Sequence, residues 1–255
     1  MPTTTTRRVL LAFGLALALA ASFAGGAVFA ASWLGDTAKG NGTLRKQDRT
    51  PGRFDAIELS LPAQVEVRLG AADGVSIETD ENLLPLVETV VEGGTLQLRP
   101  IRRNLQLDTR TMRIVVTAKD MRRLAVGGSG TITAATLKAP SLQFEVAGSG
   151  TINVGQLQSD AVAAEISGSG SMKLAGSAKR LAVELAGSGE VAAPQLRSDD
   201  VSVEIAGSGT ATVWAVDALR AEIAGSGDVA YWGDARTTTA VAGSGRIKRL
   251  GATPR

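Results

Sequence analysis

Five glutamates recur at nearly equal intervals in the second half of the chain and are the clearest candidates for chemistry. Each stands three residues before a Gly-Ser-Gly tripeptide: Glu145, Glu165, Glu184, Glu204 and Glu222. If the repeats stack, the carboxylates lie about 5 Å apart and repel by roughly 0.8 kcal/mol per neighbouring pair even in water. A divalent cation such as Ca²⁺, or Lys and Arg from an adjoining face, could offset this repulsion. The alternative is a solvated acidic row that keeps the protein soluble.

A second acidic set lies at similar positions of successive repeats and consists of Asp160 and the pair Asp199 and Asp200. Polysaccharide-cleaving enzymes of the β-helix type place paired carboxylates on such a face, where they serve as acid and base. Arg180 falls between the two and favours the ionised form of both, which suits ion pairs better than acid catalysis. We therefore prefer a row of surface ion pairs and keep a carbohydrate-active enzyme as the alternative.

Three aromatic residues gather near the C-terminus. Trp214 and Trp232 stand seven residues after the first Gly of adjacent tripeptides, and Tyr231 is beside the second. Stacked exposed rings could bind the faces of sugar rings. Alternatively, they could cover the open end of the core, where Leu250 takes the same position in the last repeat.

The composition excludes several classes of function. The chain contains neither His nor Cys, so thiol chemistry, disulfides and His-assisted serine nucleophiles are absent. Without residues 1–30, which hold two arginines and no acid, basic and acidic residues are equal in number. This balance gives no support to nucleic-acid binding. We expect no cofactor and no metal ligand set beyond the glutamate row.

The elements that would position these side chains are set by seven copies of Gly-Ser-Gly. The tripeptides begin at Gly128, Gly148, Gly168, Gly187, Gly207, Gly225 and Gly243. A period of 18 to 20 residues is typical of a solenoid in which each repeat forms one coil. Because Gly reaches positive φ without a Cβ penalty, each tripeptide is predicted to form a corner between two strands.

The residues on either side of each tripeptide alternate between apolar and polar, which is the period of a half-buried strand. The position two residues before the first Gly is apolar in every copy, from Val126 to Val241. We therefore predict an all-β, parallel β-solenoid with 18–20-residue coils over residues 125–250, followed by a short tail at 251–255.

Residues 52–124 lack the tripeptide but are also rich in strand patterns, including a hairpin around Gly93-Gly94. This stretch is predicted to be an irregular cap that covers the exposed edge of the first coil. Residues 1–30 resemble a secretory signal cut after Ala30, or an uncleaved N-terminal anchor, and residues 31–51 a linker. The folded part is therefore expected outside the cytoplasm, with membrane contact only through an uncleaved N-terminal segment.

Several motifs occur in a fixed order before the tripeptides. They are Phe54-Asp55-Ala56-Ile57, Val65-Glu66-Val67, Asp80-Glu81-Asn82-Leu83-Leu84 and Gly94-Thr95-Leu96. With the Gly-Ser-Gly series they resemble the bacterial head GIN domain proteins, described as autotransporter adhesins, over about residues 53–250. The resemblance implies an envelope or surface protein with a right-handed β-helix-like fold and no established biochemical activity.

The hypothesis that follows is an exported, non-enzymatic scaffold, adhesion or binding module. Its partner is unknown, and envelope glycans and surface proteins are the classes that suit it. A carbohydrate-active enzyme and a membrane-anchored sensory domain are the alternatives.

Overall fold

The computed structural model describes residues 36–254, so the signal or anchor expected at residues 1–30 lies outside the described part. Residues 36–254 contain strands and one short 3-10 helix, η1 (Leu84–Leu86), and no α-helix. The same residues contain no helix that is long and apolar enough to cross a membrane. The all-β prediction is therefore confirmed.

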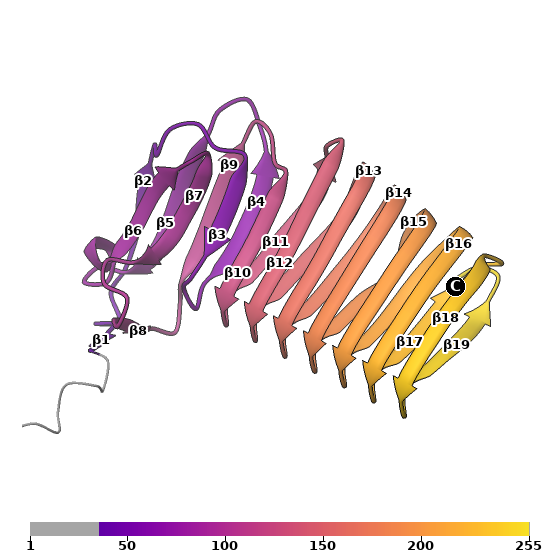
Figure 1. The fold of residues 1–255 in the computed structure, drawn as a ribbon. Helices are drawn as coiled ribbons and strands as arrows, with labels where there is room; N and C mark the ends of the chain where they lie inside the picture. The colour runs from indigo at the N-terminus through magenta and orange to yellow at the C-terminus, as the bar shows by residue number, and fades with distance from the viewer. Residues whose placement is uncertain (1–35, 255) are drawn as a thin grey trace, which may run out of the picture. The chain divides into compact units, whose positions relative to one another are not determined.

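The repeat region forms a parallel solenoid, as the tripeptide spacing predicts (Figure 1). Its strands are β10 (Arg123–Gly128), β11 (Thr131–Lys138), β12 (Ser141–Gly148), β13 (Thr151–Gly168), β14 (Ser171–Gly187), β15 (Glu190–Gly207), β16 (Thr210–Gly225), β17 (Asp228–Trp232), β18 (Arg236–Gly243) and β19 (Arg246–Gly251). From β13 to β16 a single long, bent strand makes up nearly a whole coil. Each coil pairs in parallel with the next, so equivalent side chains stack in rows.

Two kinds of Gly make the tripeptide corner possible. The first Gly has positive φ in every copy, for example +126° at Gly168, which confirms the corner prediction. The third Gly is packed against the preceding coil. A Cβ on Gly170 would lie 2.7 Å from the carbonyl oxygen of Gly150 and would overlap Val146. The coils also join here through the backbone, because the N–H of Ser169 donates to the Gly148 oxygen at 2.9 Å.

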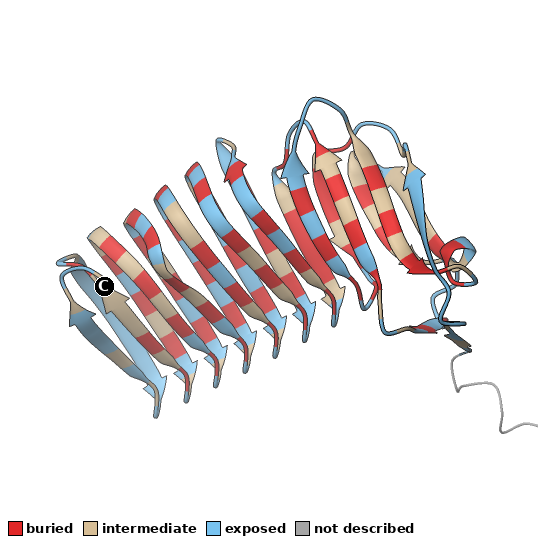
Figure 2. Cartoon of the chain, turned by 180° about the vertical axis from the view of Figure 1, so that it is seen from behind, coloured by how far each residue is buried: buried red, intermediate tan, exposed pale blue. Residues whose placement is uncertain are grey.

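The core is a continuous stack of mainly small and branched apolar side chains inside the coils. Figure 2 shows buried positions recurring along the strands of every coil from β10 to β16. Each coil has a second corner opposite the tripeptide, which in β13 lies near the buried Ser159. Buried positions alternate with exposed ones in β13 both before and after this corner. Each strand therefore has one face in the core and one in water, as its period-two pattern predicts. The outward positions are the ones available for binding.

The N-terminal part, up to Arg122, forms the predicted cap but does not follow sequence order. Its strands are β3 (Ala56–Leu59), β4 (Gln64–Leu69), β5 (Gly74–Asp80), β6 (Val87–Glu92), β7 (Thr95–Pro100), β8 (Gln106–Asp108) and β9 (Arg113–Ala118). β3 and β4 lie between the first repeat coil on one side and β7 and β9 on the other. The chain thus lays down one coil, builds its outer neighbour, and then returns to start the repeats.

Antiparallel strands form the outer end of the cap, both beyond β7 and beyond β9. β6 pairs with β7 through the hairpin at Gly93 and Gly94, both with positive φ, as predicted. β5 pairs antiparallel with β9. Antiparallel pairing needs only short turns, whereas another parallel strand would need a further crossover.

The stretch expected to be a linker differs from that expectation over its described residues. It contains β1 (Thr37–Lys39), which pairs with β8, and β2 (Leu44–Arg49), which pairs antiparallel with β5. The polar composition that indicated a linker belongs to a strand whose residues are nearly all exposed. Its position is set instead by the backbone ladder and by Arg49, whose guanidinium donates to the carbonyl oxygens of Val87 and Leu84 at 2.6 and 2.7 Å.

Candidate functional site

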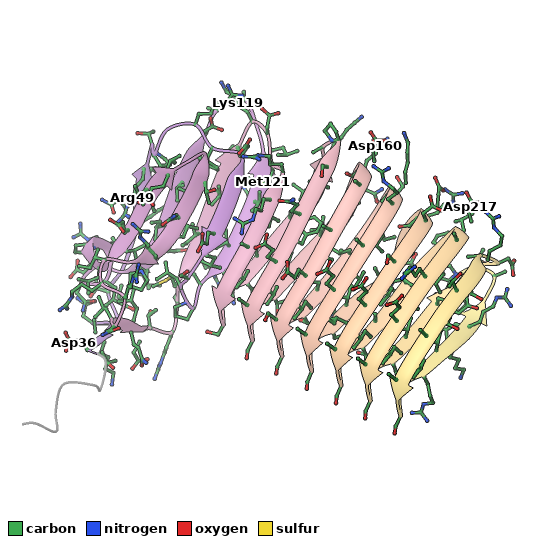
Figure 3. The ribbon with its side chains drawn as sticks, viewed as in Figure 1. Asp36, Arg49, Lys119, Met121, Asp160 and Asp217 are labelled. Atoms are coloured by element: carbon green, nitrogen blue, oxygen red, sulfur yellow. The ribbon has the colours of Figure 1, made fainter. Side chains whose placement is uncertain are left out.

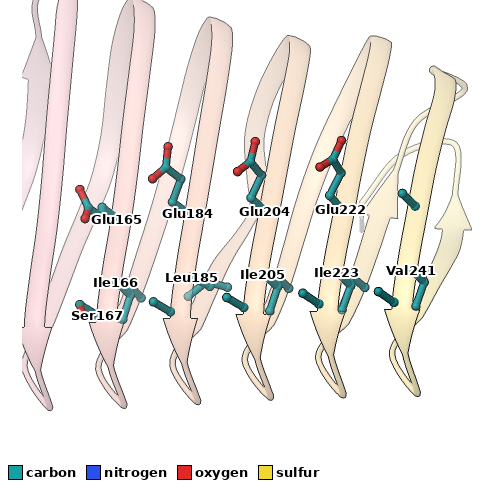
Figure 4. Close-up of a pocket in the computed structure, with 15 residues that line it drawn as sticks. Glu165, Ile166, Ser167, Glu184, Leu185, Glu204, Ile205, Glu222, Ile223 and Val241 are labelled. Carbon is teal, nitrogen blue, oxygen red and sulfur yellow. The ribbon is translucent and has the colours of Figure 1, made fainter. Parts of the chain in front are cut away.

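The five glutamates stack in one row, as the solenoid register requires. Glu145, Glu165, Glu184, Glu204 and Glu222 pair in direct register from β12 to β16. Figure 4 shows four members of the row, Glu165, Glu184, Glu204 and Glu222, on the strand segments that precede the tripeptide corners. Neighbouring strands lie about 4.8 Å apart, so the row is a line of evenly spaced carboxylates.

Small residues form a second outward row two positions further along each strand. They are Ala147, Ser167, Ala186, Ala206, Ala224 and Ala242. Between the two rows the surface forms an open groove of about 510 Å³ that extends from Glu165 to Ala242. We call this surface, with the glutamate row as one wall and the small residues as its floor, the glutamate groove.

The glutamates at the two ends of the row form ion pairs with arginines, and within the described residues the three glutamates between them do not. Arg123 binds Glu145 through two hydrogen bonds of 2.8 and 2.6 Å. These bonds hold the pKa of Glu145 below its usual value, and nearby positive charge acts in the same direction. Glu222 pairs with Arg220. Among residues 36–254, no side chain forms an ion pair with Glu165, Glu184 or Glu204.

The predicted offset of repulsion by Lys or Arg therefore applies only to the ends of the row. In the described part of the chain, no three acidic residues are grouped closely enough to hold a metal ion. Parallel stacking places the carboxylates along a line rather than around a point, so each cation would find at most two neighbours. The geometry suits a partner with several spaced positive charges better than a single Ca²⁺ ion.

The aspartates proposed as an alternative site lie along the second corner of the coils, where Figure 3 labels Asp160. Asp160 forms an ion pair with Lys179 at 2.7 Å, and this hydrogen bond keeps its pKa below the usual value. Asp199 pairs with Arg197 at 3.0 Å, and Asp200 lies beside Arg180 in the register. Each carboxylate thus has a cationic neighbour, in line with the preferred interpretation of surface ion pairs.

The aromatic residues separate into two environments. Tyr231 pairs in register with the fully buried Val213 and packs against the core near its C-terminal end. Trp214 and Trp232 pair with each other on the outer side and are half-buried. A register shift places Gly251, rather than Leu250, opposite Trp232. The sequence spacing thus predicted the tryptophan pair but not the shift.

A second hollow was not predicted from the sequence. It has a volume of about 640 Å³ and lies where the segment between β7 and β8 overhangs the outer face of β3 and β7. Its walls come from four separate segments, among them the first Gly-Ser-Gly corner at Ser129. Apart from Ser129, no repeat or motif marks these residues, because they meet only through the non-sequential order of the cap.

Comparison with known proteins agrees with this geometry. The family model for "Putative auto-transporter adhesin, head GIN domain" matches residues 53–235. No curated protein matches the sequence.

Solved structures of three bacterial proteins have the same fold. A putative adhesin from Bacteroides fragilis has a TM-score of 0.79 at 22% identity, covering 84% of this chain and 100% of its own. A putative lipid binding protein from Parabacteroides distasonis has a TM-score of 0.71 at 27% identity, with coverage of 84% and 100%. A putative adhesin from Parabacteroides merdae has a TM-score of 0.67 at 24% identity, with coverage of 84% and 99%.

Proposed function

The chain belongs to the head GIN domain family, and from this premise we propose that it is an exported, non-enzymatic binding module of the cell surface. Its binding surface is the glutamate groove, and its partner is an envelope glycan or surface protein that presents spaced positive charges. The observation that carries the proposal is the row of three unpaired carboxylates at Glu165, Glu184 and Glu204, in register beside a floor of small side chains.

The shape of the groove supports an extended partner. Its length follows the stacking direction of the coils, and it is shallow because Ala and Ser form the floor. A linear chain could lie along it and meet one carboxylate per coil. Such contacts add along the row, so several weak interactions can give useful affinity together.

The state of the aspartates supports a non-enzymatic role. An acid catalyst needs a carboxyl group that holds its proton near neutral pH. Asp160 has the opposite tendency, because Lys179 stabilises its ionised form. Asp199 is likewise ion-paired.

The family supports placement at the cell surface, and residues 1–30 supply the export segment expected from the sequence. Mass measurement of the protein after cell fractionation tests this part. A mature protein that begins at Ala31 supports cleavage, whereas an intact N-terminus in the membrane fraction supports the anchored alternative. Recovery in the cytoplasm would contradict export.

Binding along the glutamate groove can be tested with a cationic oligosaccharide. We expect the exported protein to bind a fully deacetylated glucosamine tetramer and to bind the N-acetylated tetramer far more weakly, since only the first carries positive charges. The double variant Glu184→Gln plus Glu204→Gln should reduce affinity about ten-fold, because each lost charge contact is worth roughly 0.5–1 kcal/mol. Isothermal titration calorimetry at low and physiological salt measures both effects.

A matched control is available outside the groove. Glu190→Gln plus Asp217→Asn also removes two exposed negative charges, at positions that do not line the groove. If the two double variants lose affinity equally, the net charge rather than the groove is responsible, and the proposal is wrong. Equal binding of both tetramers would contradict it as well.

A further inference from the structure

The second hollow has the features of a preformed ligand site and is independent of the glutamate groove. We call it the cap groove. Its polar lining comes from Glu58 on β3, Ser60 just after β3, and Gln97 and Arg99 on β7. The overhanging segment and the start of β8 add Arg103 and Gln106 together with the apolar Leu105 and Leu107. Its volume of about 640 Å³ is within the usual range for small-molecule pockets.

The overhanging wall is held firmly in place. Leu105 and Leu107 line the cap groove, are about 95% buried and belong to the hydrophobic core cluster. β8 pairs with β1, and the N–H of Gln106 donates to the Asp36 oxygen at 2.8 Å. The Arg102 side chain also binds Asp36 at 3.0 Å. Because the wall is fixed from both sides, a ligand would not need to order it, which reduces the entropic cost of binding.

The lining suits hydroxyl groups better than a peptide backbone. β3 and β7 are each hydrogen-bonded to another strand along both edges. The floor of the cap groove therefore presents no free strand edge that could take up an extended peptide. Side-chain amides and hydroxyls from Gln97, Gln106, Ser60 and Ser129 supply donors and acceptors instead. Pro62 and Pro100 add apolar surface that can contact the C–H faces of a sugar.

The charges of the cap groove indicate one anionic group on the ligand. Arg99 is already engaged by Glu88 at 2.7 Å and by Glu92 at 3.1 Å. Arg103 is exposed, and no acidic side chain of residues 36–254 forms an ion pair with it. Glu58 lies on the β3 side and repels a second anionic group there. The guanidinium of Arg103 is therefore the position for a carboxylate, which its planar donors bind in bidentate geometry.

From these contacts we infer that the cap groove binds a short acidic oligosaccharide, with a sugar carboxylate on Arg103 and neutral hydroxyls toward Glu58. This site is separate from the glutamate groove in position and in ligand charge. Its success or failure therefore does not depend on the binding of a cationic partner there.

The test measures binding of a galacturonate tetramer to the exported protein by titration calorimetry. We expect saturable binding that weakens with salt, and a neutral glucose tetramer should bind at least ten-fold more weakly. Arg103→Gln should weaken galacturonate binding about ten-fold or more, since hydrogen bonds to charged groups are the strong ones. Arg110→Gln is the matched control, because Arg110 is an exposed arginine that does not line the cap groove.

A second variant tests the hydroxyl contacts. Ser60→Ala plus Gln97→Ala should weaken both tetramers while leaving the thermal unfolding midpoint nearly unchanged, since both side chains point outward. Equal loss in the Arg103 and Arg110 variants would overturn the inference. So would the absence of saturable galacturonate binding, or tighter binding of an acidic peptide than of the sugar.

Discussion

The cap and the repeat coils solve the same problem, the joining of parallel β-coils, in different ways. The repeats use one corner many times, with a positive-φ Gly and a second Gly that leaves room for the next coil. The cap uses side chains that occur once, such as Arg49 across β2 and β6, or the buried Asp80 beneath the β1–β2 turn. The repeated coils produce the glutamate row, in which identical side chains stack. The contacts that occur only once produce the cap groove, which is lined by different side chains.

The two ends of the stack differ for the same reason. The outermost strands of the cap, β2 and β6, pair antiparallel with their inner neighbours, whereas β18 and β19 at the other end pair in parallel, and among residues 36–254 each of the four pairs on one side only. The last coil keeps Val241 and Leu250 exposed at 45% and 40% and carries Arg246, Lys248 and Arg249. Charged side chains on an open edge discourage pairing with other sheets. The last coil is thus protected by the charges on its edge strands.

The largest expected effect compares the same substitution at two corners. A Cβ on Gly168 (φ +126°) would lie 2.6 Å from the Gly148 oxygen, whereas a Cβ on Gly128 (φ +112°) would have no atom within 4 Å. Gly168→Ala should therefore cost about 3 kcal/mol or more, and Gly128→Ala about 1 kcal/mol from backbone strain alone. Urea unfolding measures both. Equal costs would mean that the coil beneath does not determine the need for Gly.

The next effect concerns the unique contacts of the cap. The Asp80 carboxylate is buried and accepts hydrogen bonds from the Gly42 N–H at 2.6 Å and the Thr109 hydroxyl at 2.5 Å. Asp80→Ala should cost about 2–3 kcal/mol, because the Gly42 N–H loses its acceptor and the Thr109 hydroxyl keeps only the carbonyl oxygen of Thr111. Hydrogen exchange should accelerate over residues 41–49 and stay unchanged in β13–β16. The exposed Asp48→Ala is the control, and an exchange increase spread over the repeats would contradict a local role.

A smaller, pH-dependent effect tests the ion pair between the first two coils of the repeats. Arg123 lowers the pKa of Glu145 in the folded state, so this contact stabilises the protein above the usual Glu pKa and is lost as pH falls through the lowered value. Glu145→Gln should therefore cost about 0.5–1 kcal/mol at pH 7 and nearly nothing near pH 3. Thermal unfolding at the two pH values measures the difference. A cost that stays constant with pH would contradict the ion pair as the cause.

The last expected effect is of similar size and has the opposite sign. Glu184→Gln plus Glu204→Gln removes repulsion along the unpaired middle of the row and should raise the unfolding midpoint by roughly 2–4 °C at low salt, for a gain of about 1 kcal/mol. The gain should shrink at 0.5 M salt, because exposed charges are screened. Lower stability of the variant at low salt would mean that the carboxylates make stabilising contacts.

The sequence by itself determined the repeats and their rows. A tripeptide at intervals of 18 to 20 residues and period-two alternation are both local signals, and parallel stacking converts them directly into the register of Glu145 to Glu222. The corner glycines and the Gly93-Gly94 hairpin were predictable for the same reason, since they depend on backbone conformations that few residues adopt.

Only the tertiary structure decided the order of coils in the cap, the strand role of residues 44–49, and the cap groove. β3 lies between β7 and β10, although β3 ends at Leu59, β7 begins only at Thr95 and β10 only at Arg123. Strand pairings between such distant segments produce no repeated pattern in the sequence, because each contact is made only once. The residues of the cap groove therefore had no common signal before the chain was folded.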